Sequence, residues 1–135
     1  MIRHIDDRTS VSHQLTVKDI ADLPGQGVTM LINNRPDGED ADQPAAAEIE
    51  AAAERAGLAY RHVPIIRGIG PGDVEAMQDA LDEAGEGKVL AFCRSGNRSA
   101  LVYALTQRAA GVPREEIERR LAAVGIDSGP IQHLL

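Results

Sequence analysis

Aromatic side chains are almost absent from this sequence of 135 residues, which has one Phe, two Tyr and no Trp. A buried core must therefore be built from Ala, Val, Ile and Leu. Hydrophobic residues make up 43% of the chain, which is sufficient for a globular fold. At this length we expect one domain, covering residues 1–135, because the chain is long enough for a proper core and too short for two.

Basic residues are also scarce, with 14 Lys and Arg against 21 Asp and Glu, which gives a net charge of −7. No long basic stripe exists, so a nucleic acid or an anionic membrane is not expected as a partner. The chain has no apolar run of about 18 residues, the length that a membrane span requires, and its first residues lack the apolar core of a signal peptide. We therefore predict a soluble cytoplasmic protein.

Cysteine occurs once, as Cys93, which excludes an internal disulfide and any zinc site built from several cysteines. The histidines show no spacing typical of metal ligands, neither with one another nor with carboxylates. We expect no metal and no cofactor.

The single cysteine opens a loop between a strand and a helix. Lys88–Phe92 is an apolar run typical of a buried strand, and residues 100–110 have the pattern of a helix. In the intervening segment Cys93-Arg94-Ser95-Gly96-Asn97-Arg98-Ser99, backbone N–H groups and the positive helix end converge and favour an anion. The same field stabilises a thiolate, which predicts a nucleophilic Cys93.

The cysteine loop resembles the active-site loop of rhodanese-type sulfurtransferases and the phosphate loop of tyrosine and dual-specificity phosphatases. A wider resemblance rests on Asp6-Asp7-Arg8, on Ile32-Asn33-Asn34-Arg35-Pro36-Asp37-Gly38-Glu39 and on Tyr60-Arg61-His62-Val63-Pro64. These segments are similar to a bacterial family, the phosphatase-like domain of beta-lactamase hydrolase-like proteins, some members of which carry the name sulfurtransferase. The resemblance implies a dual-specificity-phosphatase-like fold.

Strands alternate with helices along the chain. The patterns predict strands over 10–14, 28–33, 58–66 and 88–92, and helices over 16–23, 44–56, 71–84, 100–110 and 113–124. This order predicts an α/β fold with three αβα layers around a mainly parallel sheet of four or five strands. Ligands of such sheets bind outside the carboxyl ends of the strands, where the loops 33–42, 66–72 and 93–99 should meet.

Arg98 is the strongest candidate for holding the anion, and Arg94 can contribute or lie on the surface. The span from Cys93 to Arg98 matches the rhodanese loop, whereas the resembling tyrosine phosphatases place their arginine one position later. Backbone groups of Ser95, Gly96 and Asn97 complete the predicted site. Ser99 can hydrogen-bond the thiolate or cap the helix, and we favour the cap.

A phosphatase also needs a proton donor for the leaving oxygen. The resembling dual-specificity enzymes carry an aspartate three residues after a proline like Pro64, and this chain has Arg67 there. Arg67 cannot donate a proton but can bind an anion. Asp37 is the alternative acid, although Pro36-Asp37-Gly38 is also an ordinary turn sequence. Arg35, in the same turn, is a further anion-binding candidate.

Three functions remain open. In the first, which we favour, Cys93 takes sulfane sulfur from a small anionic donor and passes it as a persulfide to an external thiol or protein acceptor. In the second, Cys93 attacks a phosphate ester and forms a phosphocysteine. In the third, the loop senses an anion without catalysis. The absent acid and the loop length favour sulfur transfer.

Overall fold

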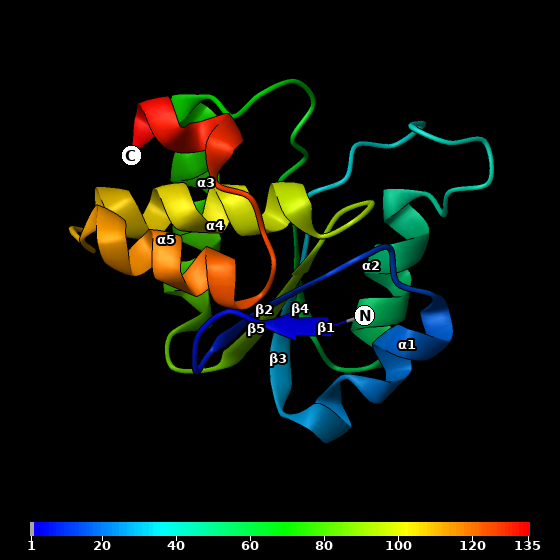
Figure 1. Cartoon of the computed structure of the whole chain (residues 1–135). Helices are drawn as coiled ribbons and strands as arrows, with labels where there is room; N and C mark the ends of the chain where they lie inside the picture. The colour runs from blue at the N-terminus through cyan, green and yellow to red at the C-terminus, as the bar shows by residue number, and fades with distance from the viewer. Residues whose placement is uncertain (1) are drawn as a thin grey trace.

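Five strands form one sheet, with helices on both of its faces (Figure 1). The computed structural model of the chain describes residues 2–135. The strands lie in the order β1-β2-β5-β3-β4, with β1 antiparallel to β2 and the other neighbours parallel. Their bounds are β1 Ile2–His4, β2 Thr9–Ser12, β3 Val28–Asn33, β4 Ala59–His62 and β5 Lys88–Phe92. The predicted mainly parallel sheet is confirmed.

Two helices lie on one face of the sheet and three on the other. The first face is covered by α1 Val17–Asp22 and α2 Ala46–Arg55. The 3-10 helix η1 Pro24–Gln26 directly follows α1 in the chain. The second is covered by α3 Pro71–Ala84, α4 Asn97–Ala109 and α5 Arg114–Ala123, together with the 3-10 helix η2 Gly129–Leu134. This arrangement confirms the three αβα layers. Within residues 2–135, the helices are too short or too polar to cross a bilayer.

The helix ends follow from local chemistry. Thr16 caps α1 by accepting from the Asp19 N–H, and the Asp19 carboxylate accepts from the Thr16 N–H in return. Pro71 begins α3 because its fixed φ suits the first helical position, and Gly85 ends it. The bounds predicted for α3 from this Pro and Gly are confirmed.

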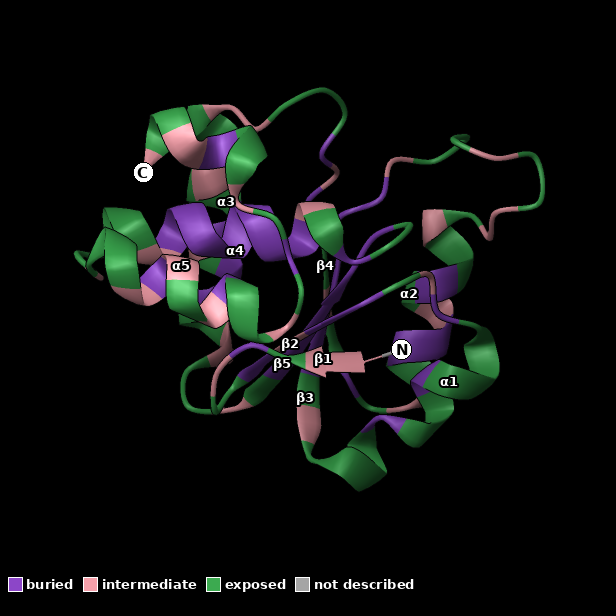
Figure 2. Ribbon diagram, viewed as in Figure 1, coloured by how far each residue is buried: buried purple, intermediate pink, exposed green. Residues whose placement is uncertain are grey.

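The sheet divides the core into two parts, and its central strand β5 contributes side chains to both. Val89 and Ala91 face α3, α4 and α5, whereas Leu90 and Phe92 face α1 and α2. All four side chains are buried, as a parallel strand covered on both faces requires (Figure 2). Residues 99–106 of α4 are buried on every side because the sheet, α3 and α5 surround this helix.

Asp6 ties the start of the chain to α4. Its carboxylate accepts hydrogen bonds from the Arg8 and Thr9 N–H groups at 2.8 and 2.7 Å, and from the Tyr103 hydroxyl at 2.5 Å. Arg120 of α5 donates to the same hydroxyl at 3.0 Å. Burial opposes ionisation of Asp6, but these hydrogen bonds outweigh it and lower the pKa of the carboxyl. Asp6 therefore braces the β1–β2 turn.

Several predicted bounds differ from the structure. β1 has no counterpart among the predicted strands, and β2 begins one residue earlier than expected. β4 ends at His62 rather than at Ile66, although the Val63 and Ile65 N–H groups still donate to the Asn33 and Asn34 carbonyls. α4 begins at Asn97 rather than at Ala100, so Arg98 belongs to the first turn of the helix and not to the loop.

Candidate active site

Cys93 follows β5 at the edge of the sheet where the parallel strands end. Ser12 and Asn33, the last residues of β2 and β3, are both in register with Phe92. The Cys93 N–H donates to the Ser12 carbonyl at 3.3 Å, and the side chain is fully buried. Because β5 is the middle strand, Cys93 is held between the loops that follow β2 and β3.

The loop after Cys93 folds back on its sulfur. The Gly96 N–H donates to Cys93 Sγ at 3.1 Å. Gly96 has a φ of 95°, in the left-handed region. A Cβ at Gly96 would lie 3.3 Å from both the carbonyl carbon and the oxygen of Ser12. Glycine is therefore required here by its backbone conformation and by the close approach of β2.

Arg98 lies in the first turn of α4 and binds a carboxylate with both terminal nitrogens. Its Nη1 and Nη2 donate to the two oxygens of Glu39 at 2.7 and 2.8 Å. Nη1 also donates to the Ile65 carbonyl at 2.9 Å, which fixes the guanidinium against the loop after β4. The hydrogen bonds that Arg98 donates to Glu39 raise the pKa of its guanidinium above the usual value. This two-point geometry is the one that arginine uses for carboxylates and phosphates.

Arg35 is the second arginine of the site, and its side chain is 4% exposed. It donates to Glu39 at 3.0 Å, to Gln14 at 3.0 Å and to Asp40 at 2.6 Å. The two carboxylates compensate the buried charge of Arg35. Arg35 thus orders the loop that carries Glu39.

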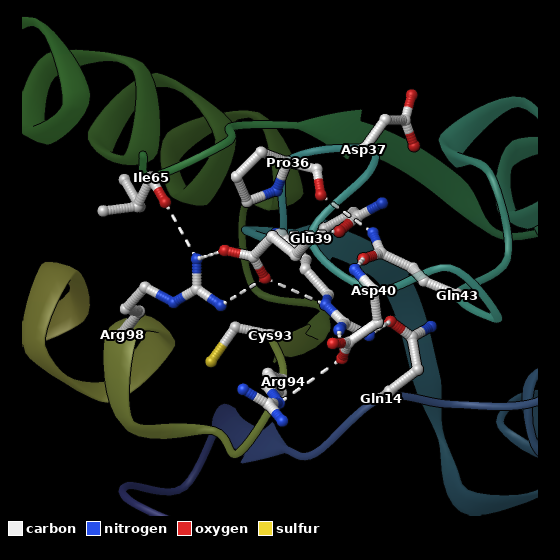
Figure 3. A network of polar contacts seen from close by, with 12 residues as sticks. Gln14, Pro36, Asp37, Glu39, Asp40, Gln43, Ile65, Cys93, Arg94 and Arg98 are labelled. Atoms are coloured by element: carbon white, nitrogen blue, oxygen red, sulfur yellow. Dashed lines mark hydrogen bonds and ion pairs between the residues drawn. The ribbon is translucent and has the colours of Figure 1, made fainter. Parts of the chain in front are cut away.

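Glu39 joins the two arginines. Its carboxylate accepts from Arg98 and Arg35, and these hydrogen bonds, that from Arg98 first, hold its pKa below the usual value. Glu39 is consequently ionised at neutral pH. Its oxygens lie at the edge of the Arg98 guanidinium that carries the two terminal nitrogens, close to Cys93 (Figure 3). A carboxylate of the protein therefore lies where an oxyanion substrate would be bound.

Two asparagines fix the beginning of the same loop. The Asn33 side chain accepts from the Arg35 N–H at 2.9 Å. The buried Asn34 side chain donates to the Val63 carbonyl at 2.9 Å, which joins this loop to the one after β4. These contacts place Arg35 and its partners at the end of β3.

The remaining residues of the cysteine loop are more exposed. The Arg94 side chain is 70% exposed, with Nε 3.5 Å from an Asp40 oxygen. Ser95 Oγ accepts from the Asn97 N–H at 3.3 Å, and the Ser95 carbonyl accepts from Arg3 of β1 at 3.2 Å. Arg3 thereby ties the loop to the edge strand. The structure places Arg94 farther from the centre of the network than Arg98.

Ser99 does not cap α4, which corrects the expectation from the sequence. The cap position belongs to Gly96, and Ser99 lies within the first turn. Its hydroxyl is buried and has no hydrogen-bond partner among the described residues. The early start of the helix explains the difference, because the loop is shorter than the apolar pattern indicated.

Neither residue considered for proton transfer is placed beside the thiol with a free acid group. Asp37 accepts from the Ala46 N–H at 2.7 Å, at the beginning of α2, and its side chain points away from Cys93 (Figure 3). Arg67 is exposed on the loop after β4. His62 is also exposed, and its Nε2 is 2.9 Å from the Arg35 carbonyl. The structure thus gives no support to proton donation by Asp37.

Sequence reasoning did not assign roles to Glu39, Asp40 and Gln14. Glu39 and Asp40 follow Arg35 closely in the sequence. Acidic residues so near an arginine, at the predicted sheet edge, could have been recognised as its ion-pair partners. Gln14 follows β2, and nothing in the sequence near it indicates its contact with Arg35. Within residues 2–135, no three His, Cys, Asp or Glu side chains gather closely enough to hold a metal ion.

The sheet order, the position of Cys93 after the middle strand and the Arg98 side chain beside it are those of a phosphatase-like α/β domain. Comparison with solved structures places the fold with tyrosine and dual-specificity phosphatases. The structure of Tk-PTP in its active form has a TM-score of 0.74 and 17% sequence identity, and the match covers 98% of this chain and 92% of Tk-PTP. The fold implied by the resemblance is confirmed.

The chain belongs to the family of the phosphatase-like domain of beta-lactamase hydrolase-like proteins, whose model matches residues 1–110. A beta-lactamase hydrolase-like protein of Xylella fastidiosa is 39% identical over 127 residues, which are 93% of this chain and 29% of the relative. This chain thus spans less than a third of that relative's length. A candidate phosphatase from Neisseria meningitidis has 35% identity and a TM-score of 0.82, with 98% and 95% of the two chains covered.

Proposed function

We propose that this domain is a cysteine-dependent phosphatase that acts on phosphate monoesters, with Cys93 as the nucleophile. The two-point contact between Arg98 and a carboxylate beside Cys93 carries this proposal, because it is a built oxyanion site. Its family and the similarity to a candidate phosphatase support this reading over sulfur transfer, which we favoured from the sequence alone.

The proposed reaction has two steps. The Cys93 thiolate attacks phosphorus, the bond to the ester oxygen breaks, and the leaving group departs as an anion that takes its proton from solvent, while phosphocysteine forms. Water then attacks the phosphocysteine, which releases inorganic phosphate and restores the thiolate. Arg98 binds two phosphoryl oxygens in both steps, and the Gly96 N–H stabilises the thiolate before attack and after release. The substrate must displace Glu39 from Arg98.

The carboxylates around the site restrict which esters can react. Glu39 and Asp40 are ion-paired with arginines, and Asp37 is bonded to the start of α2. These three groups are therefore engaged as acceptors and are not placed as proton donors. We infer that the preferred esters have leaving groups that depart without a proton, such as phenols of low pKa or carboxylates.

Sulfur transfer is the second candidate, and one observation favours it. The span from Cys93 to Arg98 is one residue shorter than in tyrosine phosphatases and suits a smaller guest. In this reaction the Cys93 thiolate attacks the sulfane sulfur of thiosulfate, sulfite departs, and a persulfide remains. An external thiol then takes the sulfur, because the chain has one cysteine. No proton donor is needed for sulfite to leave.

Two parallel assays separate these functions. The purified domain is incubated with 4-nitrophenyl phosphate while nitrophenol release is followed, and with thiosulfate before its intact mass is measured. We expect nitrophenol release by the wild-type chain and none by Cys93→Ser. A sulfur atom added to Cys93, without ester hydrolysis, would replace the phosphatase proposal with sulfur transfer. Equal hydrolysis by Cys93→Ser would overturn both, because each requires the thiolate.

A further inference from the structure

A hollow of about 490 Å³ lies beside Arg98 on the side facing the C-terminal segment. It is formed by the loop after β4, the start of α4 and the 3-10 helix η2, which lies over the start of α3 in Figure 1. Most of its walls are apolar. They are supplied by Ile65, Ile69, Leu101, Pro130, Ile131 and Leu134. This volume is in the range of small-molecule sites.

Arg98 belongs both to the hollow and to the candidate anion site. The Arg98 side chain lines the hollow, and its Nη1 is bonded to the carbonyl of Ile65, another lining residue. The same guanidinium binds the Glu39 carboxylate beside the cysteine loop. An anion bound by Arg98 in place of Glu39 would therefore have the mouth of the hollow next to it.

The ionisable side chains that line the hollow are all basic types. Arg67 and His133 line it together with Arg98, and its lining includes no Asp or Glu among the described residues. This local excess of basic groups contrasts with the net charge of −7 of the whole chain. A ligand that suits both the apolar walls and the basic residues has an apolar body and a negative head group.

We propose that this hollow binds the organic part of the substrate, and that the substrates are phosphate esters with an apolar body, such as aryl phosphates. This proposal rests on the proposed function and specifies its substrate class. The phosphoryl group is bound by Arg98, and the apolar body lies against Ile69 and Leu134. Leu134, whose side chain is 46% exposed, becomes covered when the ligand binds.

Binding of phosphonates, which cannot be hydrolysed, tests the proposal without catalysis. Calorimetry with methyl-, propyl-, hexyl- and benzylphosphonate should show affinity that rises with the apolar body. Full burial of a methylene group corresponds to about fourfold in affinity, so we expect at least a tenfold gain from methyl to hexyl. Equal affinities for all four phosphonates would overturn the assignment of the hollow.

Two matched variants locate the effect. Leu134→Asp places a charge in the hollow and should abolish the gain with chain length. Val17→Asp makes the same kind of change at an exposed aliphatic residue of α1 and should preserve the gain. A gain retained by Leu134→Asp would contradict the proposal. If the gain depends on Leu134 but the domain hydrolyses no phosphate ester, the hollow stands and the phosphatase proposal fails.

Discussion

The two carboxylate oxygens of Glu39 accept hydrogen bonds from the two terminal nitrogens of Arg98, at 2.8 and 2.7 Å. Both residues lie at the end of the sheet where Cys93 emerges from β5. Glu39 thereby has the contact that a phosphoryl group would make with the same arginine. Binding of a substrate must compete with a group of the protein itself, and four of the predictions below concern this end of the sheet.

Replacing Glu39 by Gln should weaken that competition. Because the amide lacks the negative charge, an oxyanion should displace it more easily, and we expect kcat/KM for 4-nitrophenyl phosphate to rise about threefold or more. Glu86→Gln makes the same change in the exposed turn before β5 and should have no effect. A fall of more than about tenfold in Glu39→Gln would mean that Glu39 positions Arg98 for catalysis.

Arg98 and Arg94 should differ strongly in their contribution to turnover. Arg98→Ala removes the two-point anion contact, which corresponds to about 2–3 kcal/mol of transition-state stabilisation, or about 30- to 150-fold in kcat/KM. Arg94 is largely exposed, with one ion pair at 3.5 Å, and Arg94→Ala should change kcat/KM less than about threefold. Steady-state kinetics on both variants makes the comparison. Similar small losses would reduce Arg98 to a structural role.

Placing a carboxyl group at position 67 should supply the absent proton donor. Arg67→Asp is expected to raise the hydrolysis of phenyl phosphate at least about tenfold, while 4-nitrophenyl phosphate should gain little because its leaving group departs without protonation. Arg67→Ala separates this effect from loss of the positive charge and should not accelerate phenyl phosphate hydrolysis. Equal rates for the Asp and Ala variants would show that position 67 does not reach the leaving oxygen.

Gly96→Ala should destabilise the fold more than another glycine substitution with the same backbone conformation. Gly111 has a φ of 98°, close to the 95° of Gly96, but a Cβ at Gly111 meets no atom within 4 Å. Left-handed strain, about 1 kcal/mol or more, should affect both alanine variants. Only Gly96→Ala also pushes the loop away from Ser12, so its unfolding free energy in urea should fall further. Equal losses would mean that β2 moves without cost.

The contribution of Asp6 to stability should depend on pH. Its pKa in the folded state is lowered from 3.8, so the stabilisation is complete above that value and is lost as the pH falls through the lowered pKa. Asp6→Asn should lower the unfolding free energy by about 1.5–3 kcal/mol at pH 7, and the difference from wild type should shrink toward pH 3. Urea denaturation over this range measures it. The exposed Asp7→Asn variant should show no comparable loss at pH 7.

Those elements with strong local signals could be predicted from the sequence. Pro71 and Gly85 bound α3, and the apolar run before Cys93 is β5. β1 could not be found in this way, because Ile2–His4 is a short, partly exposed edge strand whose conformation depends on pairing with β2. The local conformational preferences of these three residues do not indicate that they pair with β2.

The sequence indicated Cys93 and Arg98 as the centre of the candidate site but not the residues around them. A thiol between a buried strand and a helix indicated Cys93 and Arg98 without tertiary information. The partners of Arg98 could not be derived from the sequence. Glu39 is 59 residues away, and the conformation of the loop after β3 brings it to Arg98. Asp37 and Glu39 belong to the same acidic turn, and only the folded backbone determines which of the two faces the thiol.

The position of β5 between β2 and β3 has a consequence for synthesis of the chain. While the first 87 residues leave the ribosome, β2 and β3 each present an edge whose partner has not yet been made. Their pairing with β5 closes long segments of chain, a step that slows folding and exposes unpaired strands to other molecules. Because Cys93 directly follows β5, the nucleophile takes its place when the last strand completes the sheet. The candidate site is therefore assembled only when the sheet is closed.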